Sequence, residues 1–137
     1  MSYLIDTNVL SEVMRPKPAP AVLDWFTRAR LADQWLSVVT IGELRRGVAL
    51  LRHRGGIARA EKFEQAIADI ESRHGDRILP VTTEVVRAWA RISVHSIDIA
   101  DGLIAATALT HGLAVVTRNV KHFEETGAAV INPFGAG

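Results

Sequence analysis

Short uncharged runs alternate along the chain with longer stretches in which apolar residues recur at helical spacing. Residues 113–116 form such a run and are typical of a buried strand. Residues 57–74 carry apolar positions on one face, which is typical of an amphipathic helix. The pattern predicts strands at 4–5, 35–39, 77–81, 113–116 and 130–131, and helices at 8–14, 21–31, 40–52, 57–74, 83–95 and 97–111. This alternation indicates an α/β fold, a three-layer sandwich with a central mainly parallel sheet flanked by helices.

Local signals refine where these helices begin, end and face. Thr40 is followed three residues later by Glu43, which matches a capping box, so a helix is expected to begin there. Gly112 matches the C-cap of the last long helix. In the helix at 83–95, the residues expected to face inward are Val86, Trp89, Ala90 and Ile92.

Composition narrows the class of protein. A chain of 137 residues fits a single domain spanning 1–137, and 48% hydrophobic with 23% charged residues excludes disorder across its length. Without cysteine there are no disulfides or thiolate metal sites, which fits a cytoplasmic location. Neither a signal peptide nor a membrane span is expected, because charges interrupt every long apolar stretch. The net charge of +1 lacks the basic excess of many nucleic-acid-binding proteins.

Three acids follow predicted strands. Asp6 comes directly after the first strand, Glu43 starts the helix after the second, and Asp101 lies near the start of the helix that leads into the fourth. Ligands of parallel sheets gather beyond the carboxyl ends of the strands. Carboxylates without cysteine or histidine favour Mg²⁺ or Mn²⁺ over Zn²⁺. The sequence therefore predicts a metal site, where a water made more acidic by the ion attacks a phosphodiester.

Each acid also has a purely structural explanation. Asp6 is placed to cap the helix that follows it, and Glu43 to complete the capping box. Asp101 is placed to favour the dipole of its helix. Spacing alone does not bring the three together, so both interpretations stay open at this point.

Four segments carry a resemblance to a known family. They are residues 4–10 (LIDTNVL), 37–47 (SVVTIGELRRG), 101–108 (DGLIAATA) and 116–123 (VTRNVKHF), the last followed by 131–134 (INPF). In this order the chain resembles PIN-domain ribonucleases, close to the VapC and FitB-like toxins of type II toxin–antitoxin pairs.

The resemblance implies a fold, an activity and partners. It implies a PIN-like sandwich and a Mg²⁺-dependent endoribonuclease, with Mn²⁺ as a substitute, whose metal-binding and catalytic acids are Asp6, Glu43 and Asp101. It also implies an RNA substrate and a cognate antitoxin that blocks the site. A homodimer is implied too, and a larger complex with the antitoxin is open.

The last motif departs from the family pattern. Many members carry an acid where this chain has His122, so a fourth carboxylate is missing. Asn119 offers a neutral oxygen for a metal-bound water, and His122 a ring that orients a water or contacts phosphate. An exposed helix position explains His122 equally well. Three carboxylates still hold one Mg²⁺, whereas a second metal becomes doubtful.

Four neighbours of the acids are candidates for supporting roles. Thr7, Asn8 and Thr117 are expected to lie beside the acids and are placed to hold carboxylates or waters. Turn and cap roles suit them equally. Asp98 lies three residues before Asp101, and a helix N-cap is its favoured role.

Basic and aromatic residues add candidates for RNA binding and for packing. Arg45, Arg46 and Arg118 are placed to contact the RNA backbone, with a solvated helix face as the alternative for the first two. Core or dimer packing is expected for Trp25, Trp35 and Trp89, and surface or helix-end positions for His53, His74, His95 and His111.

Two other functions remain as alternatives. A phosphatase of the haloacid dehalogenase type also begins with an acid after the first strand, but it needs a second aspartate at the position of Asn8. A catalytically inactive PIN-like module that dimerises and binds a partner protein is favoured by the missing fourth acid. Gathered like charges argue against it, because they are costly without a cation.

Overall fold

The computed structural model describes residues 1–94 and 96–135. Its strands are β1 (Tyr3–Ile5), β2 (Gln34–Ser37), β3 (Ile78–Leu79), β4 (Ala114–Val116) and β5 (Val130–Ile131). Its helices are α1 (Thr7–Val13), α2 (Pro20–Arg28), α3 (Val38–His53), α4 (Ile57–His74), α5 (Thr83–Ile92), α6 (Ile99–His111) and α7 (Val120–Glu124). Single 3₁₀ turns, η1 (Leu31–Asp33) and η2 (Gly75–Arg77), precede β2 and β3.

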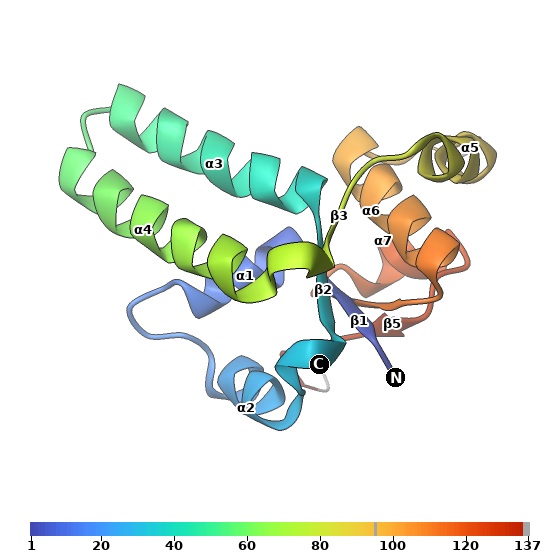
Figure 1. Ribbon diagram of the computed structural model, residues 1–137, viewed down its shortest axis with the longest axis horizontal. Helices are drawn as coiled ribbons and strands as arrows, with labels where there is room; N and C mark the ends of the chain where they lie inside the picture. The colour runs from blue at the N-terminus through green and yellow to red at the C-terminus, as the bar shows by residue number, and fades with distance from the viewer. Residues whose placement is uncertain (95, 136–137) are drawn as a thin grey trace.

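The strands form one sheet in the order β3-β2-β1-β4-β5, and their recorded pairings are all parallel. Helices α1 to α4 cover one side of this sheet and α5 to α7 the other (Figure 1). The predicted three-layer α/β architecture with a parallel central sheet is therefore confirmed.

A separate hydrophobic core lies on each face of the sheet. Successive strand residues point to opposite faces, so Leu4 packs into one core and Ile5 into the other. The same alternation separates Val115 from Val116 on the neighbouring strand. Both β1 and β4 are buried on two sides, which explains why their sequences are uncharged runs.

The start of α3 differs from the prediction. The strand predicted to reach residue 39 ends at Ser37, whose Oγ accepts a hydrogen bond from the backbone N–H of Val39 at 3.0 Å and caps the helix. Thr40 is therefore inside the first turn and buried, and the capping box with Glu43 is wrong. Two consecutive β-branched valines resemble a strand, but β2 needs only four residues to pair with its neighbours.

The two helices after β3 are shorter than predicted. Helix α5 ends at Ile92 and α6 begins at Ile99, while His95 lies outside the described residues. Gly112 ends α6 at φ 65°, a left-handed conformation that confirms the predicted C-cap. Trp89 and Ile92 pack against the core as predicted, but Val86 and Ala90 are exposed, and Val85 is fully buried instead.

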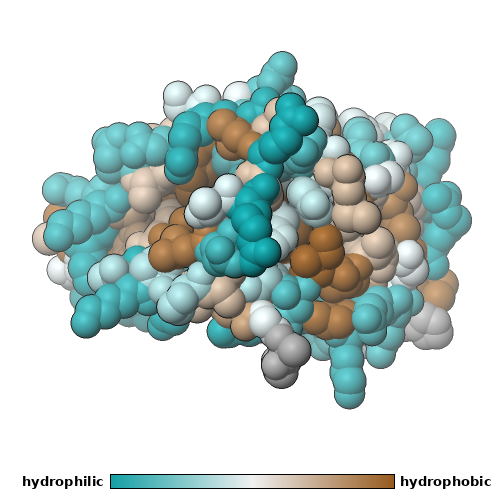
Figure 2. Space-filling view, turned by 90° about the horizontal axis from the view of Figure 1, so that it is seen from below, coloured by the Kyte–Doolittle hydropathy of each residue, from teal (hydrophilic) through white to brown (hydrophobic). Residues whose placement is uncertain are grey.

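The surface mixes polar and apolar side chains. Seen from the α2 side, hydrophobic residues reach the surface in patches separated by hydrophilic ones (Figure 2). Among the described residues, no helix combines the length and the apolarity needed to cross a membrane.

Candidate active site

The candidate site lies at the carboxyl edge of the sheet, where β1 and β4 are neighbours. The chain leaves β1 toward β2 on one side and returns as β4 on the other, so the strand order reverses at this point. Such a switch point leaves room for a ligand, because the segments that follow the two strands diverge. Asp6 follows β1 directly and Thr117 follows β4 directly.

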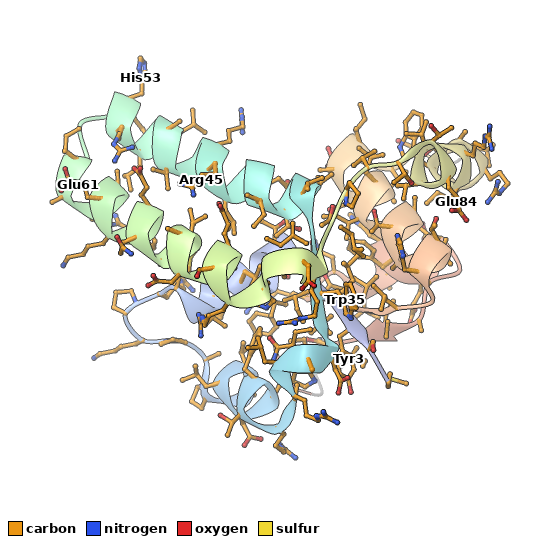
Figure 3. All side chains as sticks on the ribbon, viewed as in Figure 1. Tyr3, Trp35, Arg45, His53, Glu61 and Glu84 are labelled. Carbon is orange, nitrogen blue, oxygen red and sulfur yellow. The ribbon has the colours of Figure 1, made fainter. Side chains whose placement is uncertain are left out.

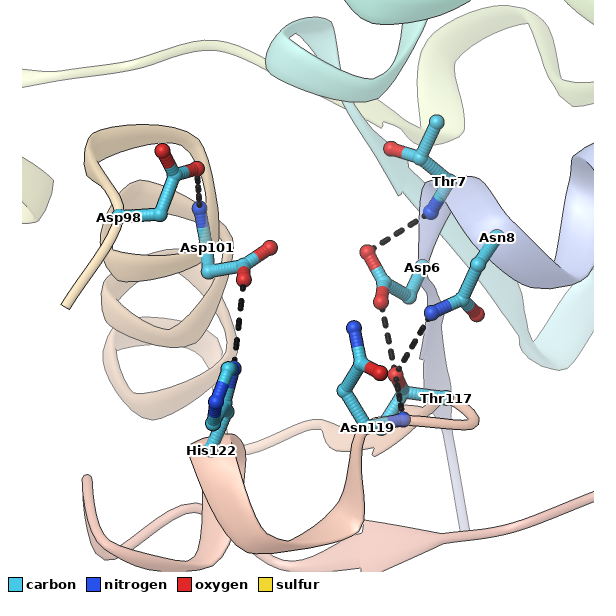
Figure 4. A network of polar contacts seen from close by, with 8 residues as sticks. All are labelled: Asp6, Thr7, Asn8, Asp98, Asp101, Thr117, Asn119 and His122. Atoms are coloured by element: carbon cyan, nitrogen blue, oxygen red, sulfur yellow. Dashed lines mark hydrogen bonds and ion pairs between the residues drawn. The ribbon is translucent and has the colours of Figure 1, made fainter.

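Asp6 is buried and held on both carboxylate oxygens. Its Oδ1 accepts a hydrogen bond from the backbone N–H of Thr7 at 2.8 Å, and its Oδ2 accepts one from the hydroxyl of Thr117 at 2.7 Å (Figure 4). The backbone N–H of Asp6 also donates to the carbonyl of Val116, which extends the ladder between β1 and β4. Asp6 therefore caps α1, as the structural alternative proposed, and lies in the candidate site as well.

Thr117 is the centre of a network that joins the two strand ends. Besides donating to Asp6, its Oγ1 accepts hydrogen bonds from Asn8 Nδ2 at 3.4 Å and from the backbone N–H of Asn119 at 3.0 Å. Asn8 Oδ1 in turn accepts from the backbone N–H of Arg118 at 3.3 Å. The segment after β4 is thus fastened to the start of α1 (Figure 4).

Glu43 reaches the same region from α3. Its Oε1 accepts a short hydrogen bond of 2.6 Å from the hydroxyl of Thr7, which also lies 3.1 Å from the hydroxyl of Thr40. A hydroxyl that donates to a carboxylate makes a charge-assisted bond, which is stronger than one between neutral groups. Thr7 therefore links α1 to α3 beside the carboxylate.

Asp101 approaches from the first turn of α6. Its backbone N–H donates to Asp98 Oδ2 at 3.4 Å, which confirms Asp98 as the N-cap of this helix. The side chain of Asp101 is 20% exposed, and its Oδ2 lies 3.9 Å from Nδ1 of His122 on α7. That distance is an ion contact and too long for a hydrogen bond.

The three acids line one open pocket of about 540 Å³. Its walls comprise Asp6, Thr7, Asn8, Ser11, Glu12, Arg15, Glu43, Asp101, Arg118 and Asn119. Asp98 and His122 lie outside this pocket and line a separate hollow. Thr117 lies beneath the pocket and is fully buried.

Burial and mutual repulsion raise the pKa of two of these acids. The pKa of Asp6 is raised to about 6. Burial is the largest cause and the charges of Asp101 and Glu43 add to it, while the hydrogen bonds from Thr117 and Thr7 oppose it. Burial also raises the pKa of Asp101, with contributions from the charges of Asp98 and Glu43 that His122 opposes. A bound cation would relieve this cost.

The acids surround the pocket without already forming a coordination sphere. In the described part of the chain, no three Asp, Glu or His side chains are arranged closely enough to hold a metal ion together. Binding an ion thus requires the carboxylates to move toward it. Asp101 has the freedom for such a movement, since among residues 1–94 and 96–135 its carboxylate is tied only to the exposed His122.

The predicted arginines separate into two groups. Arg118 lines the pocket, whereas Arg45 and Arg46 do not. Arg45 points from α3 toward α4 (Figure 3) and donates to Glu71 Oε1 through Nε at 3.1 Å and through Nη2 at 2.7 Å. The pairing leaves Arg118 as the arginine best placed among the three to meet a phosphate in the pocket.

Three pocket residues were missed by the sequence analysis. Ser11 and Glu12 follow Asn8 on one face of α1, and Arg15 lies two residues beyond the end of this helix. Glu12 is buried, accepts from the backbone N–H of Ala19 at 2.9 Å and pairs with Arg15 at 3.2 Å. Polar residues at three- and four-residue steps after Asn8 were the available signal.

The histidines were expected at the surface or at helix ends, and the tryptophans in core or dimer packing. His53 and His111 are exposed, but His74 is buried at the end of α4, where its Nδ1 lies 3.0 Å from the carbonyl of Ile70. Trp25, Trp35 and Trp89 are partly buried against the cores, as expected for packing residues.

Comparison with known proteins identifies the family. The family profile described as PIN domain matches residues 3–129. The chain belongs to the PIN-domain family. This excludes the phosphatase alternative and confirms the family resemblance of the four sequence motifs.

Two relatives and a solved structure match almost the whole PIN chain. It is 40% identical to Toxin FitB of Neisseria gonorrhoeae over 96% of this chain and 97% of that protein. It is 34% identical to VapC ribonuclease Y4jK of Sinorhizobium fredii, over 96% of each. The crystal structure of FitAcB from Neisseria gonorrhoeae superposes with a TM-score of 0.84 at 39% identity, covering 98% of this chain and 99% of that one.

Proposed function

We propose that this PIN domain is a Mg²⁺-dependent endoribonuclease that acts as the toxin of a type II toxin–antitoxin pair. The observation that carries the proposal is the convergence of Asp6, Glu43 and Asp101 on one pocket at the switch point of the sheet. Support for the activity comes from similarity over nearly the full length to a protein named as a toxin and another named as a ribonuclease.

The donor set fits a hard divalent cation. Asp6, Glu43 and Asp101 would hold it with carboxylate oxygens, the ligands that Mg²⁺ and Mn²⁺ prefer. The pKa of Asp6 and of Asp101 is raised chiefly by burial and further by the neighbouring acids, so ionising these carboxylates is costly, and a cation offsets this cost. When bound, the ion supplies Lewis-acid activation of water and neutralises charge on the phosphodiester.

The chain's own residues would fix the acids and the substrate. Thr117 holds Asp6, and Thr7 holds Glu43, each through a hydroxyl hydrogen bond shorter than 2.8 Å. The amide of Asn119 lines the pocket and would hold a water or a phosphate oxygen. Arg118 lines the same pocket and would bind a phosphate of the RNA.

His122 occupies the position where many family members have a fourth acid. It is 67% exposed and its Nδ1 lies 3.9 Å from Asp101. This contact is too long to fix Asp101, so we assign His122 to a water or a phosphate of the substrate, and we assign one cation to the site because the fourth carboxylate is missing. Asn8 and Asp98 support the site indirectly, the first through Thr117 and the second by capping α6.

A toxin of this type requires a partner. We propose that a cognate antitoxin covers the acidic pocket, that the chain forms a homodimer, and that both act in the cytoplasm. Cleavage is then prevented while the antitoxin is bound, because RNA and antitoxin compete for one opening.

The competing proposal is an inactive PIN-like module that binds a partner protein. It is favoured by the absence of a fourth acid and of a ready-made coordination sphere among the described residues. Against it stands the energetic cost of three acids around one pocket, which a purely structural domain has no reason to maintain.

A cleavage assay on a mixed RNA panel tests the proposal. We expect purified protein to cut RNA with Mg²⁺ or Mn²⁺, and we expect EDTA to stop cleavage. The Asp101→Asn variant is expected to be inactive while keeping its fold by circular dichroism. Folded wild-type protein that neither cuts RNA nor binds Mn²⁺ in a calorimetric titration would establish the inactive module instead.

A further inference from the structure

A hollow distinct from the one lined by Asp98 adjoins the acidic pocket on the side of α7. Its volume is about 470 Å³, and its walls are Arg118, Asn119, Val120, Lys121, His122 and Asn132. Arg118 and Asn119 line both the hollow and the pocket. One extended ligand can therefore occupy both the pocket and the hollow.

The two neighbouring spaces have opposite chemistry. The pocket is lined by four acids, Asp6, Glu12, Glu43 and Asp101, which outnumber its two arginines, Arg15 and Arg118. No acid lines the hollow, which presents the cations of Arg118 and Lys121, the ring of His122 and two side-chain amides. A chain that carries regularly spaced negative charges suits the hollow, and the pocket takes such a chain only with the help of a bound cation.

Arg118 is held in place without being neutralised. Its guanidinium lies over the ring of Phe134, 3.9 Å from the centroid, and its backbone N–H is fastened to Asn8. Among residues 1–94 and 96–135, no carboxylate lies within 4.0 Å of this guanidinium. The stack removes conformational freedom and leaves the donors of the guanidinium for a ligand.

The side chain of Asn132 is also held in place within the protein. Its Oδ1 accepts a hydrogen bond from the backbone N–H of Phe134 at 3.0 Å, so this amide presents its NH₂ group away from that contact. Two donors on Asn132 and the amide of Asn119 suit the carbonyl and ring-nitrogen acceptors of a base. Bases expose these edges in single strands, where they are not paired.

We propose that the hollow binds a nucleotide adjacent to the scissile phosphate of a single-stranded RNA. Arg118 and Lys121 contact its phosphate, while Asn132 contacts its base or ribose. The inference rests on the proposed ribonuclease function and adds where the substrate continues beyond the metal site. It names Lys121 and Asn132 as substrate-binding residues.

Equilibrium binding of a short fluorescent single-stranded RNA, measured in EDTA over a series of salt concentrations, tests the proposal without cleavage. We expect Lys121→Ala to weaken binding roughly three- to tenfold and to reduce the slope of log K against log salt by about 0.7, the value for one lost phosphate contact. Asn132→Ala is expected to weaken binding without changing the slope. Lys62→Ala, an exposed lysine on α4, is the matched control and should bind like wild type.

The outcomes separate this proposal from the general function. Both variants should keep wild-type affinity for Mn²⁺ by calorimetry, because neither residue lines the acidic pocket. Wild-type RNA affinity and salt slope in both variants, in protein that still cuts RNA, would overturn the nucleotide site and leave the ribonuclease function standing. Wild-type protein that neither binds nor cuts RNA would overturn both.

Discussion

The two sides of the acidic pocket are built differently. Asp6 is 2% exposed, and both of its oxygens accept hydrogen bonds of 2.7–2.8 Å from groups fixed by β1 and β4. Asp101 stands opposite on the first turn of α6, and its carboxylate is tied only by a 3.9 Å contact to an exposed histidine. The sheet thus preorganises one carboxylate before any ligand arrives, while the helix leaves the other able to adjust.

This difference explains how three acids can surround a pocket that is not yet a coordination sphere. A rigid set of three converging carboxylates would carry the full cost of their repulsion in the metal-free protein. Leaving Asp101 mobile lowers that cost, and the ion then draws it in. Four predictions test this division, beginning with the largest expected effect.

Replacing either acid should abolish cleavage. Asp6→Asn and Asp101→Asn each remove a negative charge with little change in size, so we expect a loss of at least roughly 100-fold in RNA cleavage. Affinity for Mn²⁺ should fall in both, measured by calorimetry on folded protein. Full activity in one variant would remove that residue from the site.

Asp6→Asn should make the metal-free protein more stable than wild type at neutral pH, because ionising the buried Asp6 carboxylate is costly. The pKa of Asp6 is raised from 3.8 to about 6, so folding favours its protonated form. Its contribution is fully present below pH 3.8 and is lost as the pH rises through 6. Relative to Asp6→Asn, metal-free wild type should lose up to about 3 kcal/mol of unfolding free energy between pH 4 and pH 7.

Urea titrations in EDTA at several pH values measure this difference. Adding Mn²⁺ should stabilise wild type more than Asp6→Asn, because the variant lacks one of the three carboxylates that would hold the ion. A stability difference that does not change with pH would show that Asp6 is ionised at no cost in the fold.

The elements most easily predicted from the sequence are those whose burial is decided by local pattern. The uncharged runs correctly predicted β1 and β4, and the one-sided apolar spacing predicted α4 with its observed bounds. The prediction for the start of α3 failed because Val38 and Val39 favour a strand locally, and only the strand pairing shows that β2 ends at Ser37. The inward face of α5 was predicted in part: Trp89 and Ile92 pack inward, but Val86 and Ala90 are exposed, a difference of one position that a short amphipathic pattern does not resolve.

Part of the candidate site could likewise be predicted from the sequence, and part could not. Acids placed after strands predicted a shared edge, because parallel topology brings strand ends together, and the three acids do line one pocket. Their catalytic role stays a prediction. The pairing of Arg45 with Glu71, 26 residues away, depends on how α3 packs on α4, which no local pattern contains.

Thr117→Val should weaken the preorganised side while leaving all the acids in place. Valine keeps the shape of threonine but removes the donor to Asp6 and the acceptor of Asn119 N–H. Loss of such a supporting group costs roughly 10- to 100-fold in metal affinity or activity. Thr107→Val, another buried threonine whose hydroxyl bonds only to a backbone carbonyl of its own helix, is the matched control. Equal Mn²⁺ affinity in the two variants would show that Thr117 does not position Asp6.

The adjustable side can be perturbed through the residue after Asp101. A Cβ at Gly102 would lie 3.0 Å from Cδ1 and from Nε1 of Trp89, so the indole or the first turn of α6 must shift. Gly47 lies in the interior of α3 with nothing within 4 Å of such a Cβ, which makes Gly47→Ala the matched control.

We expect Gly47→Ala to stabilise the protein by about 0.5–1 kcal/mol, the helix preference of alanine over glycine. Gly102→Ala gains the same preference but adds strain of about 1–3 kcal/mol, so it should destabilise by about 1 kcal/mol in thermal or urea unfolding. Because Asp101 moves with the first turn of α6, its Mn²⁺ affinity should fall as well, whereas the hydrogen bonds of Asp6 are untouched. A stabilised Gly102→Ala protein with wild-type Mn²⁺ affinity would show that the indole yields freely, and that Trp89 does not set the position of Asp101.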